Sequence, residues 1–420
     1  MPYRIAGIDV HKRMLAVAIA DVEVVGEFAV ERRQFGSAPS QLRVLAEWLV
    51  EQQTEEVVME STAQYWKPVW AALERYWKPL AQQRGSARRA GTLHLAQAQS
   101  NRARPGRKRD FADAERLVKR LVAQELTLSF VPDPVQRVWR TLTRTKYQLT
   151  RNRVQLQNRL EALLEEAQIK LSSFVSDLLG VSARRMLQAL ADGVTEPAAL
   201  AALAHERVRA TQEQLRDALG ACQDLNPVYR RLVKMALEDL QLLEQHIDGV
   251  DQQLAMLLGP YQDQVHRLAE VPGLGADSAQ QIIAEVGTMA ATFPSAGHLA
   301  SWVGACPGDE ETAGVSRSHR SPKGNRPMRR ILNQAANAAV KYKGSVFQTL
   351  YRRYVTRLGH NQTIAIIAHR LCRLIWKILH QGVRYEERGP AMNERSKRAR
   401  ATRMIRELRS LGYRIDLASA

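Results

Sequence analysis

Apolar and polar positions in the first sixty residues follow the pattern of short strands. The runs RIAGIDV, MLAVAIAD and VEVVGEFAV, and later EEVVME, are rich in β-forming residues and separated by polar turns, so they predict strands. Between the third and fourth runs, SQLRVLAEWLVEQ spaces its apolar residues as an amphipathic helix does. The chain is therefore predicted to open with a mixed α/β domain.

Longer helical periods follow. Between about Val135 and Gln168, and again between about His205 and Leu258, Leu and Val recur at helical spacing with few glycines or prolines. Two long helices forming a coiled-coil hairpin are the simplest interpretation, with short helices in the Ala/Leu-rich segment between them. Farther on, VPGLGADSAQQIIAEVG places a Gly-Leu-Gly turn between helical stretches, which is typical of a helix-hairpin-helix that presents backbone N–H groups to phosphate.

These patterns predict four parts. They are an α/β domain over 1–134, a helical coiled-coil connection over 135–260, a mainly α domain over 261–389 and a basic helical tail over 390–420. The chain has 420 residues, 45% of them hydrophobic, which is enough for two or three domains with their own cores.

The charge balance points to a polyanionic partner. Lys and Arg number 61 against 43 Asp and Glu, a formal net charge of +18, and nucleic acid is the leading partner for such an excess. Arg84 to Arg109 holds eight Lys and Arg and no acid, and is predicted to be mobile until it meets a phosphate backbone. Thr312 to Tyr385 holds fifteen Lys and Arg and again no acid. The absence of acids from this range predicts a surface without negative charge.

Hydropathy and cysteine spacing limit where the protein acts and what stabilises it. No run approaches the 18 apolar residues of a membrane span, and MPYRIAGIDV lacks the order of a signal peptide, so we expect a cytoplasmic protein with no membrane partner. Cys222, Cys306 and Cys372 are far apart and without metal-ligand spacing, which argues against disulfides and structural zinc.

Four carboxylates have a spacing that favours metal binding. Asp9 ends the first strand run, Glu60 ends a later one, and Asp110 and Asp113 lie three apart at a predicted helix start behind the basic segment. Each alone is explained by a helix cap or an exposed strand end. Together they predict a site for Mg²⁺, with Mn²⁺ as the alternative, that serves phosphoryl chemistry. His11 shares the strand face of Asp9 and is either a surface residue or one that orients a water or phosphate.

Two separate sets of motifs carry a family resemblance. GIDVHK, VVMES and RKRDFADAERLVKRL resemble the RuvC-like (RNase H-like) nuclease domain of the DEDD insertion-sequence transposases, the bridge-RNA-guided recombinases. VPGLGADSAQQIIAEVG, FPSAGHLASWVGACPG, KGNRPMRRILNQAANAA and HNQTIAIIAHRLCRLIWKIL are similar, in that order, to the second transposase domain of the same family. The resemblance implies that Asp9, Glu60, Asp110 and Asp113 are the metal-binding catalytic acids.

The same resemblance implies a hydroxyl nucleophile. In that family a serine, in a pattern such as E-S-A-G between CPG and KGN, is thought to form a covalent link to a DNA phosphate. Here the tetrapeptide is Glu311-Thr312-Ala313-Gly314, so threonine occupies the position. A threonine hydroxyl can be activated as a serine hydroxyl is, although its methyl group crowds the attack. Ser316 or Ser318 is the alternative nucleophile, and a weakly active or inactive chain is the third possibility.

The predicted nucleic-acid contacts are cations flanking both motif sets: Arg107, Lys108, Arg109, Arg317, Arg320, Lys323, Arg326, Arg329 and Arg330. The predicted function is a transposase that cuts and rejoins donor and target DNA. The resemblance also implies a structured non-coding guide (bridge) RNA, a homodimer or homotetramer, and a place at the bacterial nucleoid. One alternative is a metal-dependent, structure-selective nuclease of the Holliday-junction resolvase type in which water attacks. Another is a non-enzymatic DNA- or RNA-binding scaffold.

Overall fold

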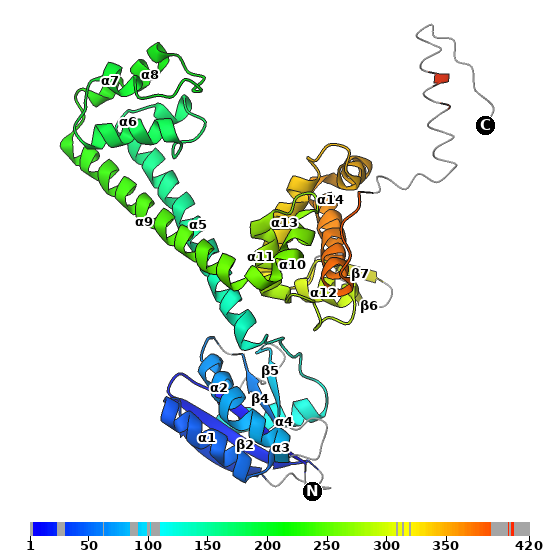
Figure 1. The fold of residues 1–420 in the computed structure, drawn as a ribbon. Coiled ribbons are helices and arrows are strands. Elements are labelled where there is room, and N and C mark those ends of the chain that lie inside the picture. The colour runs from blue at the N-terminus through cyan, green and yellow to red at the C-terminus, as the bar shows by residue number, and fades with distance from the viewer. Residues whose placement is uncertain are drawn as a thin grey trace. The chain divides into compact units, whose positions relative to one another are not determined.

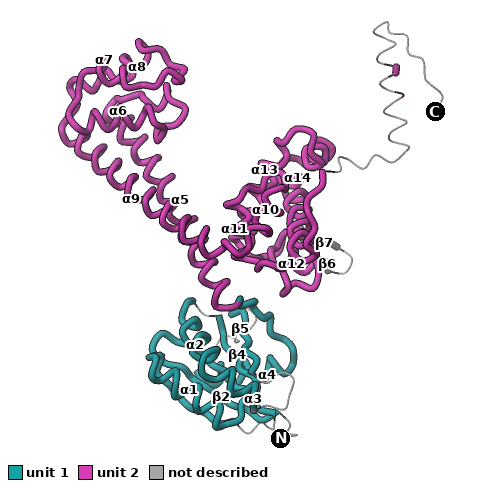
Figure 2. Tube along the Cα trace, viewed as in Figure 1, with its two compact units in different colours: residues 1–132 teal, residues 133–420 magenta. Residues whose placement is uncertain are grey.

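The protein consists of two compact units, residues 1–132 and 133–420, which are described separately (Figure 2). The computed structural model describes residues 3–22, 30–61, 63–84, 91–98, 101, 110–307, 310–312, 315–318, 321–387, 402, 405 and 406, of which 84, 310–312 and 315–318 are described for the backbone alone. The division after Pro132 falls two residues before the first predicted boundary, and the other predicted boundaries stay predictions.

The first unit is built on a five-stranded mixed sheet (Figure 1). Its strands are β1 (Arg4–Val10), β2 (Met14–Asp21), β3 (Val30–Gly36), β4 (Thr54–Glu60) and β5 (Thr92–Ala96), in the order β3-β2-β1-β4-β5. Strand β2 runs antiparallel to both of its neighbours, whereas β1, β4 and β5 are parallel. The carboxyl ends of β1 and β4 therefore meet at one edge of the sheet.

Helices cover both faces of this sheet. One face packs on α1 (Pro39–Glu51), α2 (Trp66–Ala72), a π-helical turn η1 (Leu73–Trp77) and α3 (Lys78–Arg84), and the other packs on α4 (Asp110–Val122). Alternate residues separate the two cores: Ile8 and Met59 pack on the first side, whereas Ile5 and Val58 pack with Leu117 of α4 on the second. Because odd-numbered β1 residues and even-numbered β4 residues face α4, so do Asp9 and Glu60.

The predicted strands were confirmed for β1, β2 and β4, and one prediction needs correction. The run VEVVGEFAV was also predicted as a strand; its residues 23–29 lie outside the described part, and the described strand β3 includes its last residue, Val30. The segment from Arg84 to Arg109 was predicted to be mobile, yet its TLHLA forms β5 and buries Leu95. This strand is only five residues long and owes its place to parallel pairing with β4, which local sequence does not encode.

The second unit begins with two long antiparallel helices, α5 (Pro134–Glu166) and α9 (Pro227–Leu257). The second was predicted to start near His205; it starts at Pro227, because Asn226 caps it and a proline suits a first helical turn. Between them, η2 (Leu171–Ser173), α6 (Val181–Ala191), α7 (Pro197–Ala201), α8 (Gln212–Ala218) and η3 (Gly220–Cys222) share an apolar core with the ends of the hairpin. Supercoiling of the pair stays a prediction.

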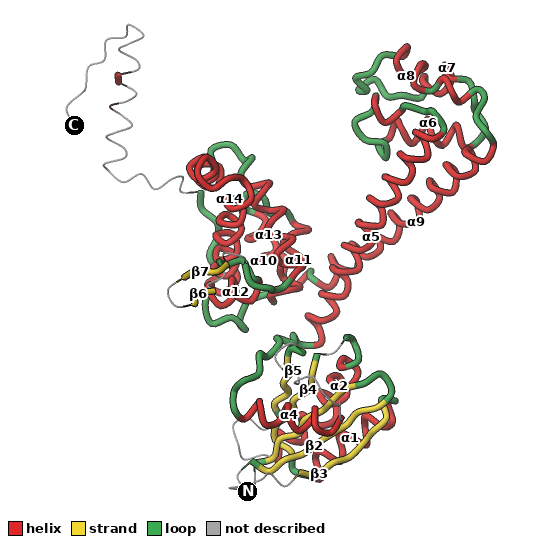
Figure 3. Tube along the Cα trace, turned by 180° about the vertical axis from the view of Figure 1, so that it is seen from behind, coloured by secondary structure: helices red, strands yellow, loops and turns green. Residues whose placement is uncertain are grey.

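The remainder of the second unit is mainly helical, as predicted (Figure 3). It contains η4 (Gly259–Tyr261), α10 (Gln262–Ala269), α11 (Ala276–Val286), α12 (Ala296–Val303), a hairpin of β6 (Glu310–Thr312) and β7 (Val315–Ser318), α13 (Arg326–Ala339) and α14 (Val346–Gln381). In the predicted helix-hairpin-helix, Gly273 has φ +87°. Its backbone lies so close to α13 that a Cβ there would be 2.2 Å from the Ala335 carbonyl oxygen. Phosphate binding by this turn stays a prediction. None of the helices in the described ranges has both the length and the apolar character needed to cross a bilayer.

Candidate active site

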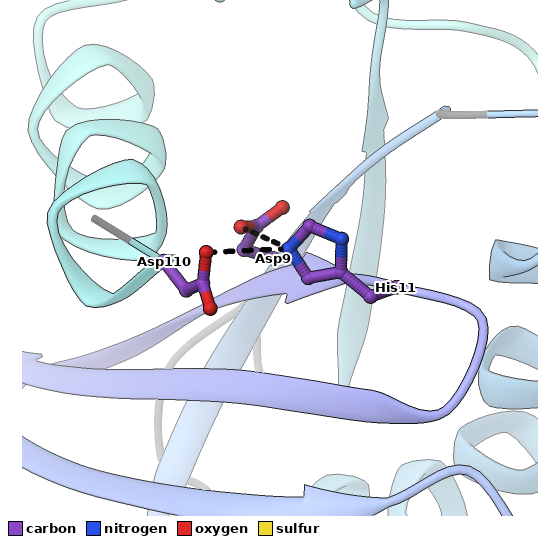
Figure 4. Close-up of side chains that lie close together, drawn as sticks. All are labelled: Asp9, His11 and Asp110. Atoms are coloured by element: carbon purple, nitrogen blue, oxygen red, sulfur yellow. Dashed lines mark hydrogen bonds and ion pairs between the residues drawn. The ribbon is translucent and has the colours of Figure 1, made fainter. Parts of the chain in front are cut away.

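All four predicted acids gather at one edge of the sheet in the first unit. Asp9 is the second-last residue of β1 and Glu60 the last residue of the adjacent parallel strand β4. Asp110 and Asp113 lie in the first turn of α4, the helix that covers the face from which Asp9 projects. Figure 4 shows Asp9 and Asp110 directed toward each other, with His11 beside them.

Gly7 allows α4 to lie this close to β1. A Cβ at this position would lie 2.1 Å from the Ala114 carbonyl oxygen and 3.0 Å from a methyl carbon of Val118. Only glycine permits such an approach of backbone to backbone. The helix start is thereby held over the end of the strand, which is why the acids of α4 reach the acid of β1.

His11 lies between two of the acids. Its Nε2 is 3.1 Å from Asp9 Oδ2 and 3.5 Å from Asp110 Oδ1 (Figure 4). The ligand atoms of these three residues lie within 4.8 Å of one another, which is compact enough to hold one cation. His11 follows β1 in the turn to β2, so the structure brings it to the site where the sequence left its part open.

Two further residues, Asn101 and Arg116, connect the other pair of acids. Asn101 Nδ2 donates to Glu60 Oε2 at 2.8 Å, and Arg116 donates to Asp113 Oδ1 at 2.6 Å and to Asn101 Oδ1 at 3.4 Å. Asn101 is only 1% exposed, so its side chain is committed to this network. Sequence reasoning missed both residues. Arg116 stands three residues after Asp113, which was a usable signal, whereas nothing in the sequence around Asn101 marks it.

The electrostatics of the site favour a bound cation. Burial raises the pKa of Asp9, and the nearby carboxylates of Asp113, Asp110 and Glu60 raise it further, while His11 acts in the opposite direction. All three of the other acids therefore lie close enough to Asp9 to act on its charge. Carboxylate oxygens are the ligands that hard divalent cations prefer, so the donor set fits such an ion.

The remaining predicted residues belong to the second unit or lie outside the described part. Thr312 ends β6 and pairs with Val315 of β7, the strand that carries Ser316, Arg317 and Ser318; the side chains of these hairpin residues are not described. The predicted contacts Lys323, Arg326, Arg329 and Arg330 lie just before and within the first turns of α13. Arg107, Lys108, Arg109 and Arg320 lie outside the described residues.

A mixed sheet of this order, with acids on its two central parallel strands and on the helix above them, resembles the RNase H-like fold. Comparisons with known proteins agree on the family. A DEDD transposase model of the IS110 type matches residues 6–169, and the model of the transposase IS116/IS110/IS902 family matches residues 265–352. The chain belongs to the IS110-type DEDD insertion-sequence transposases.

Individual relatives are more distant. The insertion element IS110 uncharacterized 43.6 kDa protein of Streptomyces coelicolor is 29% identical over 126 residues, which are 30% of this chain and 31% of that protein. The match thus spans under a third of that relative. The Thermus thermophilus RuvC structure shares 14% identity at a TM-score of 0.23, covering 30% of this chain and 99% of RuvC. The Aquifex aeolicus member of the Ppx/GppA family shares 10% at a TM-score of 0.17, covering 58% and 99%. These two likenesses add nothing to the family assignment.

Proposed function

We propose that this chain cuts and rejoins DNA as the recombinase of an insertion sequence, with a divalent cation, Mg²⁺ or Mn²⁺, held by Asp9, Glu60, Asp110 and Asp113. The observation that carries the proposal is the gathering of these acids in one site of a chain that matches both domains of the transposase family. The excess of cations, a net charge of +18, supports DNA as the substrate.

The protein's own residues hold and orient the acids. Arg116 positions Asp113, and Asn101 positions Glu60, through the hydrogen bonds described above. His11 neutralises part of the repulsion between Asp9 and Asp110 and keeps both carboxylates directed inward. When bound, a divalent cation supplies a Lewis acid that stabilises the charge developing on the phosphoryl oxygens.

The proposed nucleophile is the Thr312 hydroxyl, with Ser316 or Ser318 as alternatives from the same hairpin. Its oxygen forms a bond to a DNA phosphorus, the phosphorus bond to one DNA oxygen breaks, and that oxygen leaves with a proton as a free DNA hydroxyl. The hydroxyl proton passes to a base or to solvent. Attack of a DNA hydroxyl on the covalent phosphodiester then reverses these steps and rejoins the strand. The reaction requires the hydroxyl and the acids to act on the same phosphate.

The test is a search for the covalent intermediate. Full-length protein, guide RNA and labelled DNA substrate are incubated with Mg²⁺, and the adduct is isolated under denaturing conditions and mapped by mass spectrometry. We expect the phosphate on Thr312, no adduct with Thr312→Ala, and an adduct again with Thr312→Ser. Strand cleavage that survives Thr312→Ala, Ser316→Ala and Ser318→Ala without any adduct would show that water attacks, as in a structure-selective nuclease.

A structured guide RNA is the second proposed partner, and it rests on the family resemblance together with the basic surface. It predicts that recombination of a DNA pair requires the RNA transcribed from the element, and that changes in its loops redirect the target. Recombination of DNA by the protein without any RNA would contradict the proposal of a guide RNA.

The proposed oligomer rests on an exposed heptad stripe along α9. Its positions are Val228, Leu232, Met235, Asp239, Leu242, His246, Gly249, Gln253 and Met256, spaced alternately by four and three residues, and all are exposed. Met235 and Leu242 are 50% and 51% exposed, although the spacing is that of a helix seam. A second copy is the occupant that suits it. Antiparallel pairing about Leu242 brings Asp239 of each copy toward His246 of the other, so the stripe complements itself.

A further inference from the structure

A cleft of about 440 Å³ lies in the second unit between α5, α11 and α13, and is here called the α5–α13 cleft. The residues that matter for its chemistry are Arg144, Tyr147, Arg151, Gln281, Arg326 and Arg330. Four of these six are arginines. The three residues from α5, Arg144, Tyr147 and Arg151, were not among the nucleic-acid contacts expected from the sequence, because they lie far along the chain from the basic loop.

One acid, Glu285, also lines the cleft, and neighbouring arginines already compensate its negative charge. It is buried, and Arg144 donates to its two oxygens at 2.8 and 3.0 Å. Asn325 donates to it at 2.9 Å, and Arg140 lies 3.5 Å away. This cluster fixes α5 against α11 and the start of α13. The positive charge of the other arginines is therefore available to a ligand.

Arg330 is held ready for a ligand. Its guanidinium lies 3.4 Å from the centre of the Tyr147 ring, and its NH2 group donates to Gln281 Oε1 at 2.7 Å. Stacking fixes the plane of the guanidinium while leaving further N–H donors at its edge. Arg151 and Arg326 line the same cleft, and neither side chain has a hydrogen-bond or ion-pair partner within the described part of the chain.

We propose that the α5–α13 cleft binds the phosphodiester backbone of a nucleic acid through Arg151, Arg326 and Arg330. Three guanidinium groups that have no ion-pair partner among the described residues line one cavity, and they suit phosphate oxygens, which they can contact in pairs of hydrogen bonds. No Asp or Glu occurs from Thr312 to Tyr385, so α13 brings no repulsive charge to this side. The inference rests on the proposed function only in taking a nucleic acid as partner, and it concerns a site in a different unit from the acids.

The test measures binding of the full-length protein in EDTA, where cleavage does not contribute. The variants are Arg151→Ala, Arg326→Ala and their combination, each checked by thermal unfolding. The control is Arg231→Ala, which removes an exposed charge elsewhere on the hairpin. Duplex DNA and a structured RNA are titrated at several salt concentrations. Each single substitution is expected to weaken binding on the order of tenfold and to lower the slope of log K against log salt by about one, and the combination should lower the slope by about two. The control should change the slope for neither polymer.

The polymer whose slope falls identifies the source of the phosphate: RNA, DNA or both. An unchanged affinity and slope of the folded double variant with both polymers overturns the proposal. Tyr147→Ala gives a second measurement, because loss of the stacking frees Arg330 and should also weaken binding severalfold; Tyr147→Phe keeps the ring and should restore it. If the unaltered protein binds nucleic acid through the cleft but shows no Mg²⁺-dependent cleavage, that result would count against the proposed function alone.

Discussion

Asp9 occupies a position where burial and three neighbouring carboxylates oppose its ionisation. Its pKa is therefore higher in the folded chain than in the unfolded chain, and the folded state binds this proton more tightly. Above the folded pKa, the ionised carboxylate lowers the stability of the protein; below the unfolded value of 3.8, both states are protonated and the effect disappears. The arrangement of acids that suits a cation therefore lowers the free energy of unfolding of the metal-free protein at neutral pH.

Asp9→Asn should accordingly stabilise the metal-free protein while abolishing its activity. At pH 7 in EDTA we expect the unfolding temperature to rise by roughly 2–4 °C, because a repelled charge is removed while the amide oxygen can still accept from His11. Near pH 3.5 the difference should vanish. Mg²⁺-dependent DNA cleavage should fall by roughly 10²-fold or more. Calorimetric scans at both pH values and a cleavage assay measure these effects.

Glu51→Gln is the matched control for this change, because Glu51 is an exposed carboxylate at the end of α1 in the same unit. It should leave both the unfolding temperature and cleavage unchanged. A lower unfolding temperature for Asp9→Asn at pH 7 would contradict the account of the site's electrostatics.

The acids and their supporting residues were predictable to different degrees. Asp9, Glu60, Asp110 and Asp113 stand beside strand ends and at a helix start, so their local surroundings identify them. Asn101 supports Glu60 from 41 residues away, and its contact exists only because the chain returns to the same edge of the sheet. Local spacing carries no information about such a return.

At the scale of elements, the contact of α4 with β1 decides whether the site exists. The contact depends on Gly7, whose missing side chain makes room for the Ala114 carbonyl oxygen. Gly7→Ala should push the helix away from the strand. We expect it to lower the free energy of unfolding by about 1–3 kcal/mol and to weaken Mn²⁺ binding measurably. Chemical denaturation and titration calorimetry follow the two quantities.

Gly36→Ala provides the comparison within the same unit. A Cβ on Gly36 would first meet Cγ of Gln41 at 3.2 Å, and this flexible side chain can move aside. The substitution should therefore have a small effect on stability and none on metal binding. Equal behaviour of the two variants would show that close packing at Gly7 does not position the acids of α4.

Element boundaries show why some predictions were wrong. The helix predicted from His205 begins at Pro227, because the apolar residues of the intervening segment bury themselves in a separate core with α6 and the hairpin ends. Helical spacing alone cannot distinguish one long helix from several short ones that turn back. Strand β5 was missed for the related reason that its stability comes from β4 rather than from its own five residues.

At the scale of the whole molecule, the α9 stripe predicts self-association. Leu242→Lys places a charge at the centre of the stripe and should convert an oligomer of the full-length chain to a species of lower mass at micromolar concentration. Sedimentation velocity measures the mass, and circular dichroism checks the helices.

The control for the stripe is Val181→Lys, which alters an apolar residue that is 63% exposed on α6, outside the stripe. It should leave the mass unchanged. An unaltered mass for Leu242→Lys, or equal dissociation by both variants, would rule out α9 as the contact between copies.

The sequence by itself determined the local elements and the residue types of the acidic site, because periodicity, caps and strand ends are properties of neighbouring residues. It also determined the family, because both motif sets are contiguous. Only the tertiary structure decided that β5 completes the sheet, that Asn101 supports Glu60 and His11 reaches Asp110, and that α5 and α13 enclose an arginine-lined cleft. These features join residues tens to more than a hundred positions apart, and such contacts arise from packing and charge pairing that no local pattern records.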